Sequence, residues 1–187
     1  MIYLDHHATT PIDPEVLTAM LPWWADRVGN ASNSHHASGR AARAAVEHAR
    51  EQVAAIVNAK PREVVFTSGA TEANNMVLRG LLDDGPDGRE LLVSAVEHKS
   101  ILEPADRLRR RGVTVRQMPV DAVGRVTAEV VAAEITPATR LVSVMAANNE
   151  VGTVNPMDAI AAVCCDRNVW LHCDAAQAIG KLPDHTW

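Results

Sequence analysis

Aromatic residues and cysteine are scarce in this sequence. Its 187 residues include one tyrosine, one phenylalanine, four tryptophans and three cysteines. Three cysteines cannot all pair with one another, and their spacing matches no secreted disulfide framework. The fold must therefore depend on a hydrophobic core. Hydrophobic residues make up 47% of the chain, and its length suits one domain, so such a core is available.

Long hydrophobic runs are absent as well. No stretch of the sequence reaches the roughly 20 consecutive apolar residues that a membrane-spanning helix needs. Residues 1–7 have neither the positively charged start nor the apolar centre of a signal peptide. We therefore expect a cytoplasmic protein with no membrane partner.

An excess of positive charge is the third feature that the chain lacks. It carries 18 lysines and arginines against 23 aspartates and glutamates. Its basic cluster, Arg109-Arg110-Arg111, closes a predicted helix, where the helix dipole favours cations. The cluster predicts a solvated helix end, and no nucleic acid is expected as a partner.

The three cysteines predict buried thiols. Cys164 and Cys165 lie in a helical pattern rich in alanine and valine, and Cys173 lies in a predicted strand. Buried, unreactive side chains are the favoured interpretation. A metal site that combines Cys173 with His172 is disfavoured, because the spacing is not that of a zinc motif, and no metal is expected.

From residue 63 onward the hydrophobic pattern alternates between strands and helices. Strands are predicted at residues 63–67, 91–95, 113–118, 140–145 and 169–173, and helices at 71–82, 99–111, 127–135 and 156–167. Two further helices precede them, one starting at Asp13-Pro14 and one over residues 38–58. Apolar strands separated by helices are typical of α/β proteins in which helices cover both faces of a mostly parallel sheet.

The stretch from Val64 to Asn75 predicts a strand, a turn of small residues and the start of a helix. In this arrangement the free backbone N–H groups at the helix start, together with the helix dipole, bind an anion, typically a phosphate. Ala70 lets the backbone approach closely, and Thr71 adds a hydroxyl donor. An ordinary turn capped by serine or threonine is the alternative interpretation.

Polar residues follow the other strands, and open α/β sheets bind ligands at the carboxyl ends of their strands. His98, Asn149 and Asp174 come shortly after three of these strands. Taken singly, His98 is more typical of a surface or capping histidine and Asn149 of a turn. Asp174 should be buried, and a buried carboxylate needs a partner, preferably a cation, from the fold or from a ligand. Together with a phosphate site, these groups suit pyridoxal phosphate, whose pyridine nitrogen an acid keeps protonated.

Six motifs, in order and spacing, resemble one family. They are Tyr3-Leu4-Asp5-His6-His7-Ala8-Thr9-Thr10-Pro11, Gly29-Asn30 with Ser34-His35, Phe66-Thr67-Ser68-Gly69-Ala70-Thr71-Glu72, Glu97-His98-Lys99, Asn148-Asn149-Glu150-Val151-Gly152, and His172-Cys173-Asp174-Ala175-Ala176-Gln177. From residue 2 to about residue 183 the sequence resembles the class V aminotransferases of pyridoxal phosphate fold type I. Within that family it is similar to the cysteine desulfurases of the nitrogen-fixation and iron–sulfur assembly type. The implied fold is the large, cofactor-binding α/β domain of these enzymes.

The resemblance implies how the cofactor is held. Ala70 and Thr71 are implied to bind its phosphate. His98 is implied to stack on the pyridine ring and to take part in proton transfer, which makes it the catalytic residue. Asn149 is implied to lie near the ring and the substrate carboxylate.

The motif around Asp174 carries the remaining implied roles. Asp174 would pair with the pyridinium nitrogen, and Gln177 would hydrogen-bond the ring hydroxyl. Cys173 replaces a valine that is common before this aspartate, and it is not at the position of the family's sulfur-accepting cysteine.

The family pattern continues beyond Trp187. The resemblance places there the Schiff-base lysine, the cysteine that carries the persulfide, an arginine for the substrate carboxylate, and a smaller C-terminal domain. None of Lys60, Lys99 and Lys181 occupies the position of that lysine. We therefore expect residues 1–12 to be an N-terminal segment and residues 13–187 to be a partial cofactor-binding domain.

Three functional interpretations stay open. The first is half of a cysteine desulfurase, which converts L-cysteine to L-alanine and transfers the sulfur to a cysteine persulfide once a C-terminal half is present. The second is a fragment that binds pyridoxal phosphate noncovalently without turnover, and the third is a non-catalytic interaction module. The intact set of cofactor residues favours the first two. The resemblance also implies a homodimer or a complementary C-terminal half, and a sulfur-acceptor protein, as partners.

Overall fold

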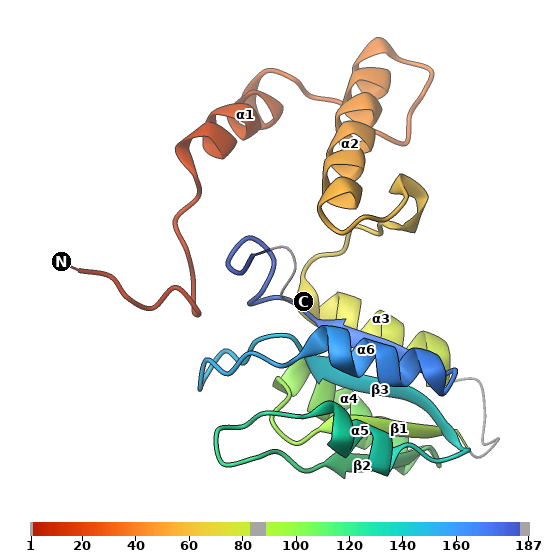
Figure 1. Cartoon of the computed structure of the whole chain (residues 1–187). Helices are drawn as coiled ribbons and strands as arrows, with labels where there is room; N and C mark the ends of the chain where they lie inside the picture. Colours follow the sequence, from red (N-terminus) through yellow and green to blue (C-terminus); the bar gives the residue numbers. More distant parts are fainter. Residues whose placement is uncertain (1, 83–88, 184–187) are drawn as a thin grey trace. The chain divides into compact units, whose positions relative to one another are not determined.

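The computed structural model describes residues 2–82 and 89–183. The chain forms two compact units, Met1–Phe66 and Thr67–Trp187 (Figure 1). All six predicted site residues belong to the second unit. The strands and helices of that unit therefore set the geometry of the site.

The first unit contains the two helices expected from its sequence. α1 (Pro14–Ala25) begins at Asp13, whose carboxylate accepts a hydrogen bond from the Glu15 N–H at 2.8 Å, with Pro14 in the first turn. α2 (Ala37–Ile56) is the long predicted helix, and a short 3-10 helix, η1 (Pro61–Glu63), follows it. Residues 2–12 form neither helix nor strand.

A close backbone contact joins α2 to the loop before it. A Cβ atom on Gly39 would lie 1.9 Å from the carbonyl oxygen of Asn33. A Cβ atom on Gly29 would lie 2.3 Å from the carbonyl oxygen of Ser38. Glycine, which has no Cβ, is the residue that fits at both positions.

The predicted strand at residues 63–67 is wrong. In the described part of the chain this segment has no neighbouring strand, and Val65 and Phe66 are 61% and 49% exposed. Arg50 of α2 binds the segment instead: its guanidinium donates to the Val64 carbonyl oxygen and lies 5.0 Å from the centre of the Phe66 ring. The β-branched composition of the segment indicated an extended backbone, but a strand also needs a hydrogen-bonded partner.

The second unit contains every other predicted strand and helix, with ends that agree within one residue. Its elements are α3 (Ala70–Leu82), β1 (Glu90–Ser94), α4 (Lys99–Arg110), β2 (Thr114–Met118), α5 (Ala128–Glu134), β3 (Thr139–Met145), α6 (Met157–Asp166) and β4 (Trp170–Asp174). The strands pair in the order β2-β1-β3-β4, and all three pairings are parallel.

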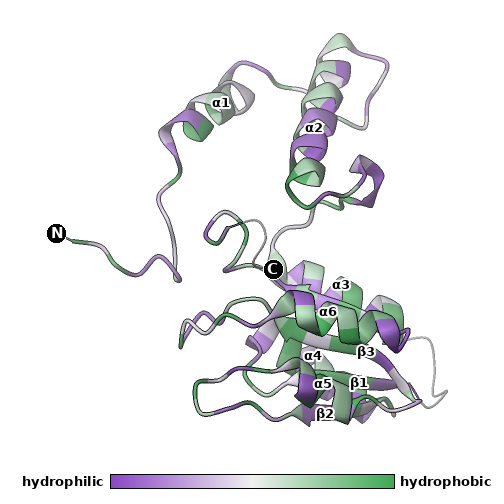
Figure 2. Ribbon diagram, in the orientation of Figure 1, coloured by the Kyte–Doolittle hydropathy of each residue, from purple (hydrophilic) through white to green (hydrophobic). Residues whose placement is uncertain are grey.

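Helices cover both faces of the sheet, which confirms the predicted α/β class (Figures 1 and 2). On one face, Leu78 of α3 and Ile101 of α4 pack with Leu141 of β3. On the other face, Val131 of α5 and Ile160 of α6 pack against inward side chains of the same strands. The hydrophobic residues of Figure 2 are concentrated in this three-layered part.

The sheet reverses its direction of growth between β1 and β3. From β1 the chain crosses to β2 on one side and then to β3 and β4 on the other, so a ligand site is expected at the carboxyl ends of β1 and β3. These ends are tied together, because the Asn148 side chain donates to the Val96 carbonyl oxygen at 2.9 Å. The Ala146 N–H likewise donates to the Asp174 carbonyl oxygen at 2.9 Å, which joins β3 to β4.

Two of the three cysteines are partly or fully buried, and one is not. Cys164 is 1% exposed and belongs to the core beneath α6, in line with Ile160 four residues earlier. Cys173 is partly buried. Cys165 is exposed, so the prediction of a buried thiol there is wrong. Adjacent helical residues differ by about 100° in direction, and only one of the two can face the sheet.

The basic cluster at the end of α4 is solvated, as predicted. Arg109 and Arg110 both pair with the exposed carboxylate of Asp106, at 2.8 and 2.6 Å. Among residues 2–82 and 89–183, no helix is long and apolar enough to cross a membrane. Within the same residues no group of three or more histidine, cysteine, aspartate or glutamate side chains is arranged to hold a metal ion.

Candidate functional site

The start of α3 has the features of an anion site. Ala70 and Thr71 are exposed, and neither backbone N–H donates a hydrogen bond to another described residue. The Glu72 carboxylate accepts hydrogen bonds from the N–H and hydroxyl of Ser68, at 2.6 and 2.7 Å, and these bonds lower the pKa of Glu72. Glu72 thus binds the donors that precede the helix, and the first two helical N–H groups stay open to a ligand.

His98 caps α4. Its Nδ1 accepts a hydrogen bond from the Ser100 N–H at 3.1 Å and lies 2.8 Å from the Ser100 hydroxyl oxygen. The ring is exposed at the carboxyl side of β1. Capping was the alternative interpretation of this histidine, and the structure shows that His98 does cap its helix. The same two contacts hold the ring at the predicted ligand-binding edge.

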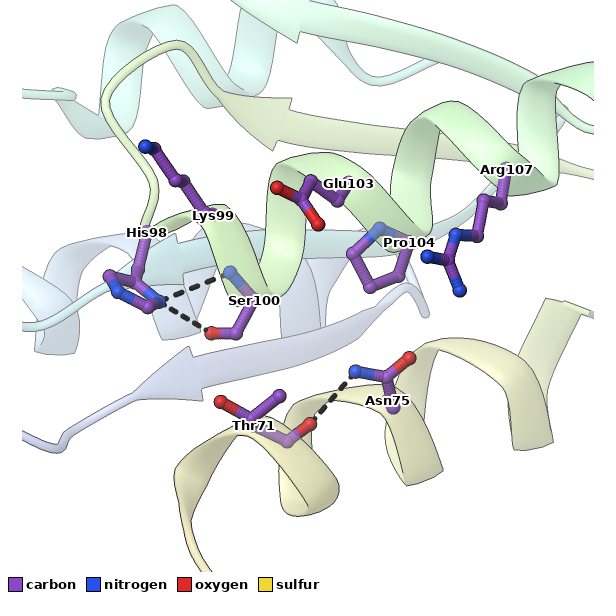
Figure 3. Close-up of a pocket in the computed structure, with 8 residues that line it drawn as sticks. All are labelled: Thr71, Asn75, His98, Lys99, Ser100, Glu103, Pro104 and Arg107. Carbon is purple, nitrogen blue, oxygen red and sulfur yellow. Dashed lines mark hydrogen bonds between the residues drawn. The ribbon is translucent and has the colours of Figure 1, made fainter.

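A pocket of about 330 Å³ lies between α3 and α4, and we call it the α3–α4 pocket (Figure 3). It contains two predicted site residues, Thr71 from α3 and His98 from α4. Lys99 and Arg107 bring positive charge to its α4 side, and Glu103 lies between them. The open N–H groups at the start of α3, a lysine and an arginine suit an anionic ligand.

Asp174 is buried at the end of β4, as predicted, with 7% of its surface exposed. Its Oδ2 accepts a hydrogen bond from the Asn74 side-chain amide at 2.8 Å, and its Oδ1 accepts one from the Ala176 N–H at 3.1 Å. No described lysine or arginine lies within ion-pair distance of it. The fold therefore gives this carboxylate an amide partner, and not the cation that was expected.

A second acid, Glu97, is buried close to Asp174. It is 5% exposed, and its Oε1 accepts a hydrogen bond from the Met145 N–H at 2.7 Å. Its Oε2 is buried without a hydrogen-bond partner. Burial raises the pKa of Glu97 to about 8; the negative charge of Asp174 adds to this rise, and the Met145 bond opposes it. At neutral pH Glu97 is mostly protonated, and Asp174 faces a neutral acid.

The same strand end carries a histidine and a thiol that burial keeps uncharged. His172 is 9% exposed, its Nδ1 lies 2.9 Å from the Ser143 hydroxyl, and burial lowers its pKa although Asp174 opposes this. Burial, with the charges of Asp174 and Glu97, raises the pKa of Cys173 to about 12. A thiol that stays protonated is a poor nucleophile, so Cys173 fits a structural role.

Asn149 and Gln177 lie at the same edge of the sheet, after β3 and β4 respectively. Both are partly buried. The Gln177 side-chain oxygen accepts a hydrogen bond from the Lys181 ammonium group. A lysine that the sequence did not connect with the site is thus in contact with one of its predicted residues.

Sequence reasoning assigned no role to three residues of the site, Asn74, Ser100 and Glu97. Asn74 and Ser100 link Asp174 to His98, because the Asn74 amide donates to Asp174 and also to the Ser100 hydroxyl, at 2.9 Å. A signal for Asn74 was present in the sequence. It lies four residues before Leu78, on the stripe of α3 that faces the sheet, where an unpaired amide is costly.

The arrangement fits a ligand that carries both a phosphate and a protonated ring nitrogen. A buried carboxylate without a cation accepts an N–H⁺ donor, and open helical N–H groups accept a phosphate. Pyridoxal phosphate has both groups, with an aromatic ring between them that an exposed imidazole can cover. Thr71 and His98 line the α3–α4 pocket, and Asp174 lies outside it but is linked to His98 through Asn74 and Ser100; together they supply the types of donor and acceptor that this cofactor needs.

Comparisons with known proteins agree with this pattern. The sequence profile described as "Aminotransferase class-V" matches residues 2–185. Cysteine desulfurase IscS of Rickettsia prowazekii is 41% identical over 183 residues, which are 97% of this chain and 45% of that protein. The chain thus spans about half the length of the curated relatives it matches, or less, and corresponds to their N-terminal part.

Solved structures show the same partial overlap. A NifS-like protein superimposes with a TM-score of 0.92 at 37% identity, over 97% of this chain and 50% of that one. SspA, solved in complex with cysteine, superimposes with a TM-score of 0.90 at 36% identity, over 94% of this chain and 51% of that one. On the match of the family profile to nearly its entire length, this chain belongs to the class-V aminotransferase family and is cysteine desulfurase-like.

Proposed function

We propose that this chain is the pyridoxal phosphate-binding part of a cysteine desulfurase. The observation that carries the proposal is Asp174, a buried carboxylate at the ligand-binding edge of the sheet with no described lysine or arginine in ion-pair range. A protonated pyridine nitrogen is the positive partner that such a carboxylate lacks. Family membership supports the same cofactor.

The other residues have roles that follow from their positions. The N–H groups of Ala70 and Thr71 bind the cofactor phosphate at the start of α3. His98 covers the ring and moves a proton at the reacting carbon, which makes it the catalytic residue of this part. Asn149 lies near the ring and the substrate carboxylate, and Gln177 donates to the ring oxygen. The bound cofactor supplies an electron sink for the substrate's α-carbon.

We propose L-cysteine as the substrate, with L-alanine and a cysteine persulfide as products and a sulfur-acceptor protein as the partner. A cysteine complex of the similar SspA structure supports this choice. Because the chain spans about half of its relatives, turnover needs the residues that the relatives carry beyond the match, on the same polypeptide or on a complementary one. Exposed Leu21, Trp24 and Phe66 support association with such a half or with a second copy in the cytoplasm.

The test is a pyridoxal phosphate titration of the purified chain, followed by absorbance and repeated with Asp174→Asn. Asparagine keeps the size of the side chain and can still accept a hydrogen bond from Asn74, but it removes the negative charge. A hydrogen bond to a charged partner contributes about 1.5–3 kcal/mol, so binding should weaken about 10- to 100-fold. Equal affinity of the two proteins would contradict the assignment of Asp174 as the ring partner.

Thr139→Val is a matched control. Thr139 is buried at the opposite end of the sheet and donates to Glu90 at 2.6 Å, so its loss removes a buried hydrogen bond without touching the site. This variant should bind pyridoxal phosphate like the parent chain. Borohydride reduction and intact mass then show whether a lysine is attached to the cofactor. A failure of the parent chain to bind at all would favour the interaction-module interpretation.

A further inference from the structure

Asn74 is a buried amide in the middle of a helix. It is 4% exposed and lies on the inward stripe of α3 with Leu78 and Leu82. A hydrophobic side chain would fill this position without the cost of burying polar atoms. Its amide is therefore expected to have hydrogen-bond partners that matter to the molecule.

Both hydrogens of the amide nitrogen are used. One is donated to Asp174 Oδ2 at 2.8 Å and the other to the Ser100 hydroxyl oxygen at 2.9 Å. An ionised carboxylate only accepts hydrogen bonds, so the nitrogen of the amide, and not its oxygen, must face Asp174. The orientation of Asn74 thus follows from the chemistry of its partner.

Ser100 in turn forms hydrogen bonds with His98. Nδ1 of His98 accepts a hydrogen bond from a backbone N–H, so the Ser100 hydroxyl, 2.8 Å from the same nitrogen, donates to it, and the Ser100 oxygen is free to accept from Asn74. The Ser100 N–H donates to the same nitrogen at 3.1 Å. With two donors directed at it, Nδ1 is the acceptor nitrogen, and the neutral ring carries its hydrogen on Nε2.

We propose that Asn74 is a positioning residue of the cofactor site. It orients the Asp174 carboxylate directly and, by donating to the Ser100 oxygen, holds the Ser100 hydroxyl against His98 Nδ1. The acid and the imidazole come from β4 and the start of α4, and Asn74 of α3 connects them. The effect on pyridoxal phosphate rests on the proposed function, whereas the effect on the hydrogen bonding of His98 Nδ1 does not.

The experiment measures both effects on Asn74→Leu, which keeps the approximate size of the side chain and removes the amide. In the parent chain without cofactor, 15N NMR of the His98 ring should show a bare Nδ1 and a protonated Nε2. In the variant, the Nδ1 signal should shift toward that of a nitrogen that accepts one hydrogen bond fewer, because the Ser100 hydroxyl is no longer held in place, while the Ser100 N–H still donates to Nδ1. Pyridoxal phosphate should bind about tenfold more weakly, the result of leaving Asp174 short of one donor.

Ser100→Ala is the second variant, and it leaves the bond between Asn74 and Asp174 in place. It removes the hydroxyl bond to Nδ1 and should shift the His98 signals as Asn74→Leu does, so the effect on His98 can be judged even when the leucine variant does not fold. Thr139→Val should leave the His98 signals unchanged, which separates the effect from a general loss of stability.

Unchanged His98 signals in both site variants would overturn the proposal. So would unchanged affinity for pyridoxal phosphate in a folded Asn74→Leu chain. If the parent chain binds no pyridoxal phosphate, the proposed function fails, while the NMR comparison still decides the link from Asn74 to His98.

Discussion

Glu97 should make the stability of the chain depend on pH, and Glu97→Gln should remove that dependence. The folded pKa of about 8 lies above the ordinary value of 4.5, so the folded chain keeps a proton that the unfolded chain loses. The stabilisation is complete below the unfolded pKa and is lost as the pH rises toward 8. Each pH unit lowers the free energy of unfolding by about 1.4 kcal/mol, so the chain should lose about 3 kcal/mol of stability between pH 5 and pH 7.

The assay is urea unfolding of both proteins across this pH range. Glutamine resembles the neutral acid and can still accept the hydrogen bond from the Met145 N–H. The neighbouring titratable groups, Asp174, His172 and Cys173, are common to both proteins, so the difference between the two curves isolates Glu97. Thr139→Val, which removes no acid, should keep the parent's slope. Parallel curves for the parent chain and Glu97→Gln would refute the reasoning.

Three further predictions concern the thiols and two glycines. A disulfide reagent at neutral pH should find one fast thiol, the exposed Cys165, because burial raises the pKa of Cys164 to about 11 and that of Cys173 to about 12; a fast thiol that survives in Cys165→Ala would contradict this. Gly80→Ala should stabilise the chain by about 0.5–1 kcal/mol, since Gly80 lies within α3 and a Cβ there meets nothing within 4 Å. Gly39→Ala should destabilise it by about 1–3 kcal/mol, because the new Cβ would overlap a carbonyl oxygen. Urea midpoints that move in the same direction for both glycines would show the packing argument to be wrong.

Most helices and strands of the second unit could be predicted, because each depends on a pattern of neighbouring residues in the sequence. The hydrophobic period changes between strand and helix along the chain, and the elements from α3 to β4 begin and end close to the expected residues. The segment at residues 63–67 could not be assigned by this route. Its composition is that of a strand, but its state depends on whether another strand lies beside it, and in this structure Arg50 binds it instead.

The position of a site residue could be predicted where the end of a single strand determines it. It could not be predicted where two residues far apart in the sequence contact each other. The burial of Asp174 follows from the apolar strand before it, and the position of His98 follows from the end of β1. The amide partner of Asp174 comes from α3, 100 residues earlier in the chain. No local pattern pairs these residues. Likewise the raised pKa of Glu97 arises from packing, which only the folded chain shows.

The hydrogen bond from Asn74 to Asp174 has a consequence for how the chain folds. Its ends are separated by 100 residues, and three parallel strands form between them along the chain. Contacts between distant residues form slowly, because a long loop must close before they contribute any stability. The contact that orients Asp174, the acid that we propose binds the cofactor nitrogen, is therefore expected among the last events of folding. A cofactor that binds there binds only chains whose sheet is already complete, and by mass action it draws the folding equilibrium toward them.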